Sequence, residues 1–368
     1  MAEKYKVLAL PGDYVGPEVV GAGLEVLEKA ASLAGLEVSI EEDLIGGASW
    51  DVHGRFCTDE VADKARTADA VLLGAVGGPK YDGIRVDGPV TESDGLTRLR
   101  IELELYNALR PARAWDALIS QTPFRRDVVE GADVMVVREN CGGIYYGEPR
   151  GWEDMPDGQE RAFEVSEYRT GEVERIARAA FEEARKRRGK VSSFDKSNVM
   201  ESGKLWRKTV TRIGAEEYPD VELEHILTDY GLFALASRPR DFDVVLADNL
   251  FGDLVSDLAG TLAGSLGMLP SATLPRAARP DERIRPGIYE PTHGSAPDIA
   301  GQGIANPLGT ILSVGMLFRY AFARPDAARA IEAAVERVVS TGTVTPDVGG
   351  TAGTTDITKA VISELQID

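Results

Sequence analysis

Histidine, cysteine and long apolar runs are scarce in this 368-residue sequence, and each shortage excludes a class of protein or site. The three histidines, His53, His225 and His293, are too few for a histidine-rich zinc centre. The two cysteines, Cys57 and Cys141, provide no disulfide framework and fit a reducing compartment. No apolar run approaches the roughly 20 residues of a membrane span, and the start lacks a signal-peptide pattern. We therefore expect a cytoplasmic protein without a membrane partner.

Basic residues are also in the minority, with 41 Lys and Arg against 60 Asp and Glu. The resulting net charge of −19 argues against nucleic acid or an anionic membrane surface as a partner. The chain is long enough for two domains, each with its own core.

The N-terminal third alternates apolar strand patterns with helical patterns. Strand patterns at 6–10, 36–40 and 70–73 are separated by helical patterns at 16–33 and 58–67. Pro17 stands in the first turn of the first helix and Thr58 caps the second. Apolar strands that alternate with helices are typical of a parallel sheet covered on both faces, so the fold class is α/β.

The same patterns continue to the end of the chain, with no internal repeat or low-complexity linker. Further strands are predicted at 107–110, 132–137, 163–168, 190–194, 221–227, 242–247 and 287–290. Further helices are predicted at 94–106, 170–188, 202–214, 229–236, 308–323, 327–340 and 357–366.

Two aspartates follow the strand pattern at 242–247. Asp253 and Asp257 are four residues apart, so on a helix their carboxylates lie on one face about a turn apart. Oxygen ligands of this kind suit Mg²⁺ or Mn²⁺ rather than zinc. Two solvated acids on an outer face are an equally good interpretation from the spacing alone.

Three arginines lie beside predicted strand ends in this acidic chain: Arg100, Arg110 and Arg138. Strand ends are where α/β proteins bind ligands, and guanidinium groups pair bidentately with carboxylates. Together they indicate a site for a di- or tricarboxylate. Each arginine taken alone is more simply a member of a surface ion pair.

Lys196 and Tyr145 are candidates for proton transfer. Lys196 follows a predicted strand and Asp229 opens a predicted helix. A lysine buried near a cation has a lowered pKa and can act as a base, while Tyr145 delivers a proton from the other side. A surface lysine and a tyrosine at the edge of the core are the simpler interpretations of each residue in isolation.

The usual dinucleotide fingerprint, G-x-G-x-x-G after the first strand, is missing, because Pro17 interrupts the pattern there. A better candidate for cofactor binding is the glycine-rich segment 293–307, which we call the cofactor segment. Its small residues allow close backbone approach, and Asp298 is suited to accept both ribose hydroxyls, which favours NAD over NADP. An ordinary surface loop remains the alternative.

Taken together, these motifs resemble the isocitrate/isopropylmalate family of β-decarboxylating dehydrogenases, and most closely its isopropylmalate branch. The resemblance runs nearly end to end and rests on ordered matches such as Leu10-Pro-Gly-Asp-Tyr-Val-Gly-Pro-Glu18 and Phe251-Gly-Asp-Leu-Val-Ser-Asp257. The other matching segments are 72–81, 99–100, 107–111, 138–151, 195–199 and 293–307.

The resemblance implies a two-domain α/β fold with parallel and mixed sheets flanked by helices, and not a Rossmann fold. Residues 1–106 and 264–368 would form a discontinuous cofactor-binding domain. Residues 107–263 would form a central domain for dimerisation, metal and substrate. The expected assembly is a homodimer with shared active sites.

The expected activity is the NAD-dependent and Mg²⁺- or Mn²⁺-dependent oxidative decarboxylation of 3-isopropylmalate in leucine biosynthesis. The resemblance assigns catalysis to Tyr145, Lys196 and Asp229, and the metal to Asp229, Asp253 and Asp257. It implies that Lys196 and Asp229 are supplied by the partner subunit. Substrate binding is assigned to Arg100, Arg110, Arg138, Leu96, Thr97 and Asn198. Cofactor binding is assigned to Glu290, His293, Gly294, Ser295, Ala296, Asp298, Ile299 and Asn306.

Several positions depart from the isopropylmalate pattern. Tyr14 stands where the family usually has glycine, and Ser93 and Thr97 replace the glutamate and the second leucine expected before Arg100. Asp94 and Leu96 disfavour isocitrate. Another alkyl- or arylmalate, homoisocitrate, tartrate or malate is therefore an alternative substrate. A catalytically silent subunit is a third hypothesis, which the complete acid–base set disfavours.

Overall fold

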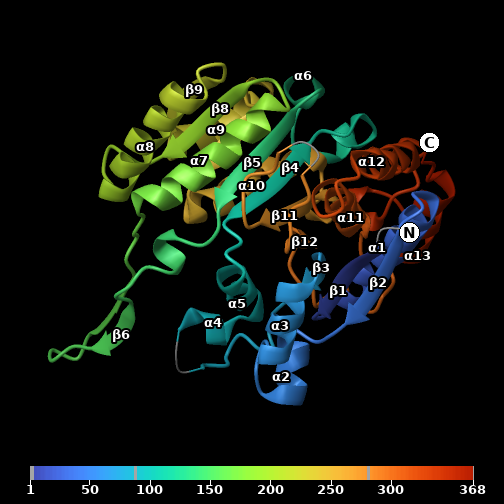
Figure 1. Ribbon diagram of the computed structural model, residues 1–368, viewed down its shortest axis with the longest axis horizontal. Helices are drawn as coiled ribbons and strands as arrows, with labels where there is room; N and C mark the ends of the chain where they lie inside the picture. Colours follow the sequence, from blue (N-terminus) through green and yellow to red (C-terminus); the bar gives the residue numbers. More distant parts are fainter. Residues whose placement is uncertain (1–3, 87–88, 280–281, 368) are drawn as a thin grey trace.

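A single ten-stranded mixed sheet organises the computed structural model, which describes residues 4–86, 89–279 and 282–367 (Figure 1). The strand order is β2-β1-β3-β12-β11-β4-β5-β10-β8-β9, and neighbours run parallel except at β12–β11, β11–β4 and β4–β5. The strands are β1 Lys4–Gly12, β2 Glu37–Glu42, β3 Ala70–Ala75, β4 Asn107–Arg113, β5 Asp133–Glu139, β8 Lys190–Asp195, β9 Glu222–Leu227, β10 Val244–Ala247, β11 Pro270–Leu274 and β12 Ile288–Pro291.

The sheet divides by sequence into two halves. Strands β1, β2, β3, β11 and β12, from residues 1–106 and 264–368, lie together on one side. Strands β4, β5, β8, β9 and β10, from residues 107–263, lie on the other. The β11–β4 ladder joins them. This separation agrees with the predicted discontinuous domains, although the domain boundaries themselves stay a prediction.

Helices cover the sheet, and a small hairpin forms a separate two-stranded sheet. The β6–β7 hairpin, Gly151–Asp154 paired with Glu160–Phe163, extends away from the body of the molecule (Figure 1). The helices are α1 Gly16–Leu33, α2 Gly47–His53, α3 Asp59–Thr67, α4 Val90–Ser93, α5 Gly95–Glu102, α6 Arg126–Val129, α7 Thr170–Arg185, α8 Glu201–Glu217, α9 Thr228–Ser237, α10 Asn249–Gly260, α11 Leu308–Tyr320, α12 Pro325–Ser340 and α13 Thr354–Glu364.

Strand β1 shows why its half of the sheet is buried on both faces. Val7 and Ala9 belong to the largest core cluster, whereas Leu8 and Leu10 belong to a second cluster with α3 and α5 residues. Because successive side chains alternate across a sheet, these two sets lie on opposite faces. The predicted α/β class, with helices on a mixed sheet, is therefore confirmed.

Local sequence signals set several helix boundaries. The Thr58 hydroxyl accepts a hydrogen bond from the Val61 backbone N–H at 3.2 Å and caps α3, as predicted. The Asp94 carboxylate accepts from the backbone N–H groups of Leu96 and Thr97 and caps α5. No helix within the described residues has the length and apolarity needed to cross a membrane.

Three predictions of local structure were wrong. The helix predicted at 94–106 ends at Glu102, because Glu104 adopts a left-handed conformation with φ of 53°. The strand predicted at 163–168 is limited to its first residue, which ends β7. Strand β11 was missed, because a five-residue segment that begins with proline gives little local signal.

Candidate active site

Two strands and one helix bring Arg110, Arg138 and Asp253 together. Arg110 lies in β4 and Arg138 in β5, and their antiparallel register puts both side chains on one face of the sheet. On that face Asp253, from α10, forms ion pairs with both arginines, at 3.3 Å from Arg110. Arg138 is 3% exposed. Burial and the neighbouring positive Arg110 lower the pKa of Arg138 to about 10, against the attraction of Asp253.

The third predicted arginine, Arg100, extends the cationic group toward β12. Its Nη2 lies 2.8 Å from Oε1 of Glu290, a residue assigned by the resemblance to cofactor binding. Within the described chain, the Nε atoms of Arg100 and Arg110 are buried and have no hydrogen-bond partner. Buried donors without partners are costly, so this arrangement favours an anionic ligand with several acceptor oxygens.

Tyr145 lies beside the same cluster. Its hydroxyl donates to Oδ2 of Asp253 at 3.2 Å, and the Arg138 guanidinium lies 5.7 Å from the centre of its ring. Burial, followed by the negative charge of Asp253, raises the pKa of Tyr145. The phenol is therefore protonated near neutral pH and is suited to donate a proton rather than to accept one.

These residues open onto a cavity of about 520 Å³, within the usual size range for small-molecule sites. Thr97 lines it, as predicted, whereas Leu96 is 8% exposed and packs into the core. The remaining lining residues are Val90, Asp94, Arg100, Arg110, Arg138, Asn140, Ile144, Tyr145, Tyr146, Arg150, Glu164, Leu250 and Asp253.

Asn249 and Ser256 support the arginines and were missed from the sequence. Asn249 accepts from Nε and Nη2 of Arg138 at 3.1 and 2.7 Å, and its amide donates to the Gly142 carbonyl. Ser256 accepts from Arg110 at 2.8 Å. The only sequence signal was the place of Asn249 just after a strand, where α/β proteins put polar site residues.

Lys196, Asp229 and Asn198 lie outside this cluster. Lys196 lies 2.5 Å from Asp229, whose pKa is lowered by this hydrogen bond. Asn198 is exposed, and none of the three lines the arginine cavity. A single chain therefore does not bring the complete predicted catalytic set together.

The predicted metal ligands are divided in the same way. Asp253 and Asp257 are one turn apart on α10, and partial burial raises the pKa of Asp257 although Arg110 opposes the shift. Among the described residues of one chain, no group of three or more His, Cys, Asp or Glu side chains is arranged to hold a metal ion. The two carboxylates fit a hard divalent cation only with a further oxygen ligand from elsewhere.

The cofactor segment follows β12 and lies at the carboxyl edge of the parallel strands β1, β3 and β12. The backbone N–H of Val15 donates to the Ser295 carbonyl at 3.1 Å, which ties this segment to the turn after β1. Ala296 has a φ of 40°, Ile299 packs on the core, and nothing lies within 4 Å of the position a Cβ would take on Gly294.

Two polar side chains of this segment have hydrogen-bonding atoms that no described residue uses. Burial lowers the pKa of His293, and its buried Nε2 has no partner in the described chain. The Asp298 side chain is exposed, and its carboxylate has no hydrogen bond or ion pair with described residues. Asn306 instead donates to Asp347 at 3.0 Å and accepts from the Leu308 backbone at the start of α11. The histidine nitrogen and the free carboxylate fit a polar, partly buried nucleoside.

Comparison with known proteins identifies the family. The family model described as isocitrate/isopropylmalate dehydrogenase matches residues 6–361. The chain belongs to this family. It is 49% identical over 366 residues to a 3-isopropylmalate dehydrogenase of Ruegeria pomeroyi, with 98% of each chain covered. It is 48% identical to one from Caulobacter vibrioides, covering 98% of this chain and 99% of the relative.

Solved structures of the family share the fold. An isocitrate dehydrogenase from Methylococcus capsulatus superposes with a TM-score of 0.84 at 31% identity, over 98% of this chain and 99% of that one. A β-decarboxylating dehydrogenase from Thermococcus kodakarensis gives a TM-score of 0.77 at 34% identity, over 98% and 96%. The resemblance deduced from the motifs is thus confirmed, and the chain is a member of a family of dehydrogenases.

Proposed function

We propose that this enzyme oxidises and decarboxylates 3-isopropylmalate to 4-methyl-2-oxopentanoate, using NAD⁺ and Mg²⁺ or Mn²⁺, as a step of leucine biosynthesis. The observation that supports this most is the convergence of Arg100, Arg110 and Arg138 on one cavity beside Tyr145 and Asp253. Three guanidinium groups match the two carboxylates of a substituted malate. The curated relatives at 48–49% identity carry the name 3-isopropylmalate dehydrogenase.

In this proposal each residue acts at a defined atom of the substrate. The three arginines bind and orient the carboxylates, Lys196 takes the proton of the hydroxyl, and Tyr145 protonates the carbon that loses CO₂. The cofactor segment would hold NAD⁺, which would supply the hydride acceptor. Asp229, Asp253 and Asp257 would hold the divalent ion, which would supply Lewis-acid stabilisation of negative charge on the substrate.

The proposed active site is shared between two copies of the chain. Lys196 and Asp229 are separate from the arginine cavity, so we propose that they act on the cavity of a partner subunit. Large apolar side chains beside them are exposed: Tyr230 and Phe233 on α9 are 51% and 66% exposed, and Leu254 on α10 is 53% exposed. Helices α9 and α10 pack together, and an apolar surface of this kind favours a homodimer contact.

For the cofactor we propose NAD bound by the cofactor segment, with adenosine near His293 and the ribose hydroxyls on Asp298. Two polar groups support this arrangement: among the described residues, neither the His293 Nε2 nor the Asp298 carboxylate has a hydrogen-bond or ion-pair partner. A negative charge at Asp298 repels the 2′-phosphate of NADP, which supports a preference for NAD.

A different substituent on carbon 3 is the second candidate. Thr97 replaces an expected apolar residue and lines the same cavity as Ile144 and Val90, so its hydroxyl adds a polar group to the cavity wall. A change on the scale of one methyl group alters discrimination by only about 1–3 kcal/mol. Ser93 is exposed and its hydroxyl donates to the Val90 carbonyl, so it has less influence on the cavity.

A substrate panel tests the proposal. NADH formation is measured with Mg²⁺ or Mn²⁺ on 3-isopropylmalate, malate, tartrate, homoisocitrate and an arylmalate. We expect the isopropyl compound to have the highest kcat/KM, and NADP⁺ to be the poorer oxidant. A bulkier or more polar malate that exceeds it by about tenfold, or 1.4 kcal/mol, would replace the isopropyl assignment.

A further inference from the structure

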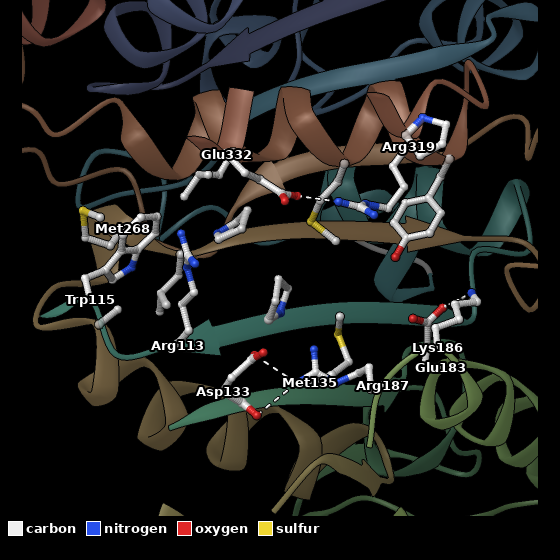
Figure 2. Close-up of a pocket in the computed structure, with 18 of the residues that line it drawn as sticks. Arg113, Trp115, Asp133, Met135, Glu183, Lys186, Arg187, Met268, Arg319 and Glu332 are labelled. Carbon is white, nitrogen blue, oxygen red and sulfur yellow. Dashed lines mark hydrogen bonds and ion pairs between the residues drawn. The ribbon is translucent and has the colours of Figure 1, made fainter. Parts of the chain in front are cut away.

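The last two residues of β5, Arg138 and Glu139, point to opposite faces of the sheet, because side chains alternate along a strand. Arg138 faces the arginine cavity. Glu139 is on the face of Asp133 and Met135, which line a second cavity behind the sheet (Figure 2). Its side chain is fully buried and does not line the arginine cavity. Burying a carboxylate is costly unless it is paired and hydrogen-bonded, so its partners indicate its role.

The Glu139 carboxylate accepts hydrogen bonds from the turn that follows β5. The backbone N–H of Gly142 donates to Oε2 at 2.7 Å, and that of Cys141 donates to both oxygens at 3.2 Å. Nη2 of Arg175, from α7, donates to Oε1 at 3.3 Å. Within the described residues, every hydrogen-bond partner of this carboxylate is therefore a donor. Such a site fits an ionised carboxylate better than an amide, whose NH₂ group would face one of the donors.

This turn leads directly to Tyr145. Residues 140–147, which we call the tyrosine loop, contain the short 3-10 helix Gly143–Tyr145. Gly143 has a φ of 74°, and a Cβ there would lie 2.5 Å from the Tyr168 hydroxyl oxygen. The loop is thus packed closely against Tyr168, while the hydrogen bonds to Glu139 fix its first residues.

Other contacts hold the tyrosine loop further along. The amide of Asn249 donates to the Gly142 carbonyl at 2.9 Å, and the exposed Arg150 donates to the Tyr145 carbonyl at 2.7 Å. Glu139 differs from both, because it is acidic, fully buried and bound to two successive backbone N–H groups. Charge-assisted hydrogen bonds are strong, and more so away from water, so the Glu139 contacts are well suited to fix the loop.

Arg138 keeps contacts that do not involve Glu139. Its Nε and Nη2 donate to Asn249 at 3.1 and 2.7 Å, and its guanidinium pairs with Asp253. Loss of the Glu139 carboxylate is therefore expected to displace Tyr145 more than it displaces the neighbouring arginine.

We propose that Glu139 is a positioning residue, whose buried carboxylate fixes the tyrosine loop so that the Tyr145 hydroxyl lies beside Asp253 at the arginine cavity. Glu139 acts through Tyr145 and does not touch the substrate. This inference rests on the proposed function, in which Tyr145 donates the proton that follows the loss of CO₂. Removal of the carboxylate should therefore slow turnover without a matching loss of substrate binding.

Steady-state kinetics of the full-length protein test this proposal in a double-mutant cycle. Burial raises the pKa of Glu139 to about 7, so assays at pH 8 examine the ionised form. With 3-isopropylmalate, NAD⁺ and Mg²⁺, we expect Glu139→Gln to lower kcat about tenfold and to change the KM of the malate less than about threefold. In a Tyr145→Phe background the same substitution should lower kcat less than about twofold, because the hydroxyl that Glu139 positions is already absent. Equal losses in both backgrounds, an unchanged kcat in Glu139→Gln, or a KM that rises as much as kcat falls would overturn the proposal.

Variants on α7 separate positioning from a general loss of packing. Glu183→Gln removes another buried carboxylate, which is 3% exposed and pairs with Lys186 at 2.7 Å in the cavity of Figure 2, and we expect it to keep kcat. A loss equal to that of Glu139→Gln would assign the effect to buried charge in general and overturn the proposal. Arg175→Gln removes the charged partner of Glu139 and serves where Glu139→Gln does not fold; kcat should fall about threefold. Arg178→Gln, one turn further along α7, is its control and should keep kcat. Melting temperatures are measured on the same samples.

The same measurements distinguish this proposal from the proposed function. A Tyr145→Phe variant with wild-type kcat would overturn the role of Tyr145, and the positioning role of Glu139 with it. A large loss of kcat in Tyr145→Phe, with none in Glu139→Gln or Arg175→Gln, would overturn the positioning role alone.

Discussion

At the scale of single residues, the sequence shows that Tyr14 is unusual at its position, but not which backbone conformation it adopts. The unusual tyrosine was visible in the motif, but its left-handed backbone, with φ of 51°, was not. Glycine, the residue that the resemblance led us to expect there, adopts this conformation without steric cost. The Tyr14 ring lies over Gly78 and edge-on to Tyr81, at 6.4 Å between ring centres. Tyr14 does not line the arginine cavity.

The sequence predicted the charged residues of the candidate site, but it did not predict the partners that support them. Arg110, Arg138 and Asp253 were predicted as ligands and lie in one cluster. Asn249 was missed because an amide that orients an arginine carries no charge or motif of its own. Such partners depend on contacts between distant segments, here 111 residues apart.

Glu139, the residue after Arg138, gives a prediction for pH. It is fully buried, and burial raises its pKa from 4.5 to about 7, although Arg175 and the backbone N–H groups of Cys141 and Gly142 oppose the shift. The native state therefore keeps a proton that the unfolded state releases, so stability falls as pH rises from about 4.5 to 7. The loss amounts to at most about 3 kcal/mol.

We expect Glu139→Gln to remove this loss, because the amide does not titrate. The free energy of unfolding is measured by urea denaturation from pH 4.5 to 8 at one protein concentration. The difference between variant and wild type should grow in favour of the variant as pH rises. Glu130→Gln, an exposed glutamate, is the control and should follow the wild type. If the free energies of unfolding of Glu139→Gln and of the wild type changed with pH in the same way, the buried carboxyl would not titrate in this range.

At the scale of elements, the sequence predicted helices whose ends are set by nearby residues, such as a capping threonine or a proline in the first turn. Helix α3 matches its prediction because Thr58 caps it, and α1 because Pro17 opens it. Strand β11 was missed because it is defined by antiparallel pairing with β12 and with β4, and β4 is far away in the sequence. Short strands of this kind are stabilised by their neighbours rather than by their own propensity.

Helix α10 depends on a glycine to approach β5. A Cβ at Gly252 would lie 2.6 Å from Cγ of Arg138, so only glycine leaves this arginine in its place. Helix propensity alone would favour alanine by about 1 kcal/mol. We expect Gly252→Ala to displace Arg138 and to lower kcat/KM by about tenfold or more, since small misplacements in active sites are costly.

Steady-state kinetics and thermal unfolding of the same samples test this prediction. Gly21→Ala is the matched control, because Gly21 lies in α1 and nothing is within 4 Å of the position that an alanine methyl group would take there. We expect that variant to keep full activity and to gain about 0.5–1 kcal/mol of stability. Full activity in Gly252→Ala would show that the contact between α10 and Arg138 is not needed for substrate binding.

At the scale of the whole molecule, one chain contains the arginines proposed to bind the substrate, but it does not bring all the proposed catalytic residues to them. The resemblance assigned catalysis to Tyr145, Lys196 and Asp229, and it led us to expect Lys196 and Asp229 from the partner subunit. The structure separates Tyr145, next to the arginines, from the Lys196–Asp229 pair next to the exposed apolar residues of α9 and α10. A shared site would explain this separation and the exposed apolar surface together.

Mixing two inactive variants tests whether the sites are shared. In a shared site, a dimer of one Lys196→Met chain and one Tyr145→Phe chain has one intact site, which combines Tyr145 of the first chain with Lys196 of the second. Random pairing of equal amounts makes half of the dimers mixed, so we expect about a quarter of wild-type activity after co-refolding. If each chain used its own residues, the mixture would stay as inactive as the separate variants. Lys196→Met mixed with the double variant Lys196→Met/Tyr145→Phe is the control, because neither arrangement leaves an intact site, and any activity in that mixture would exclude Lys196 as an essential base.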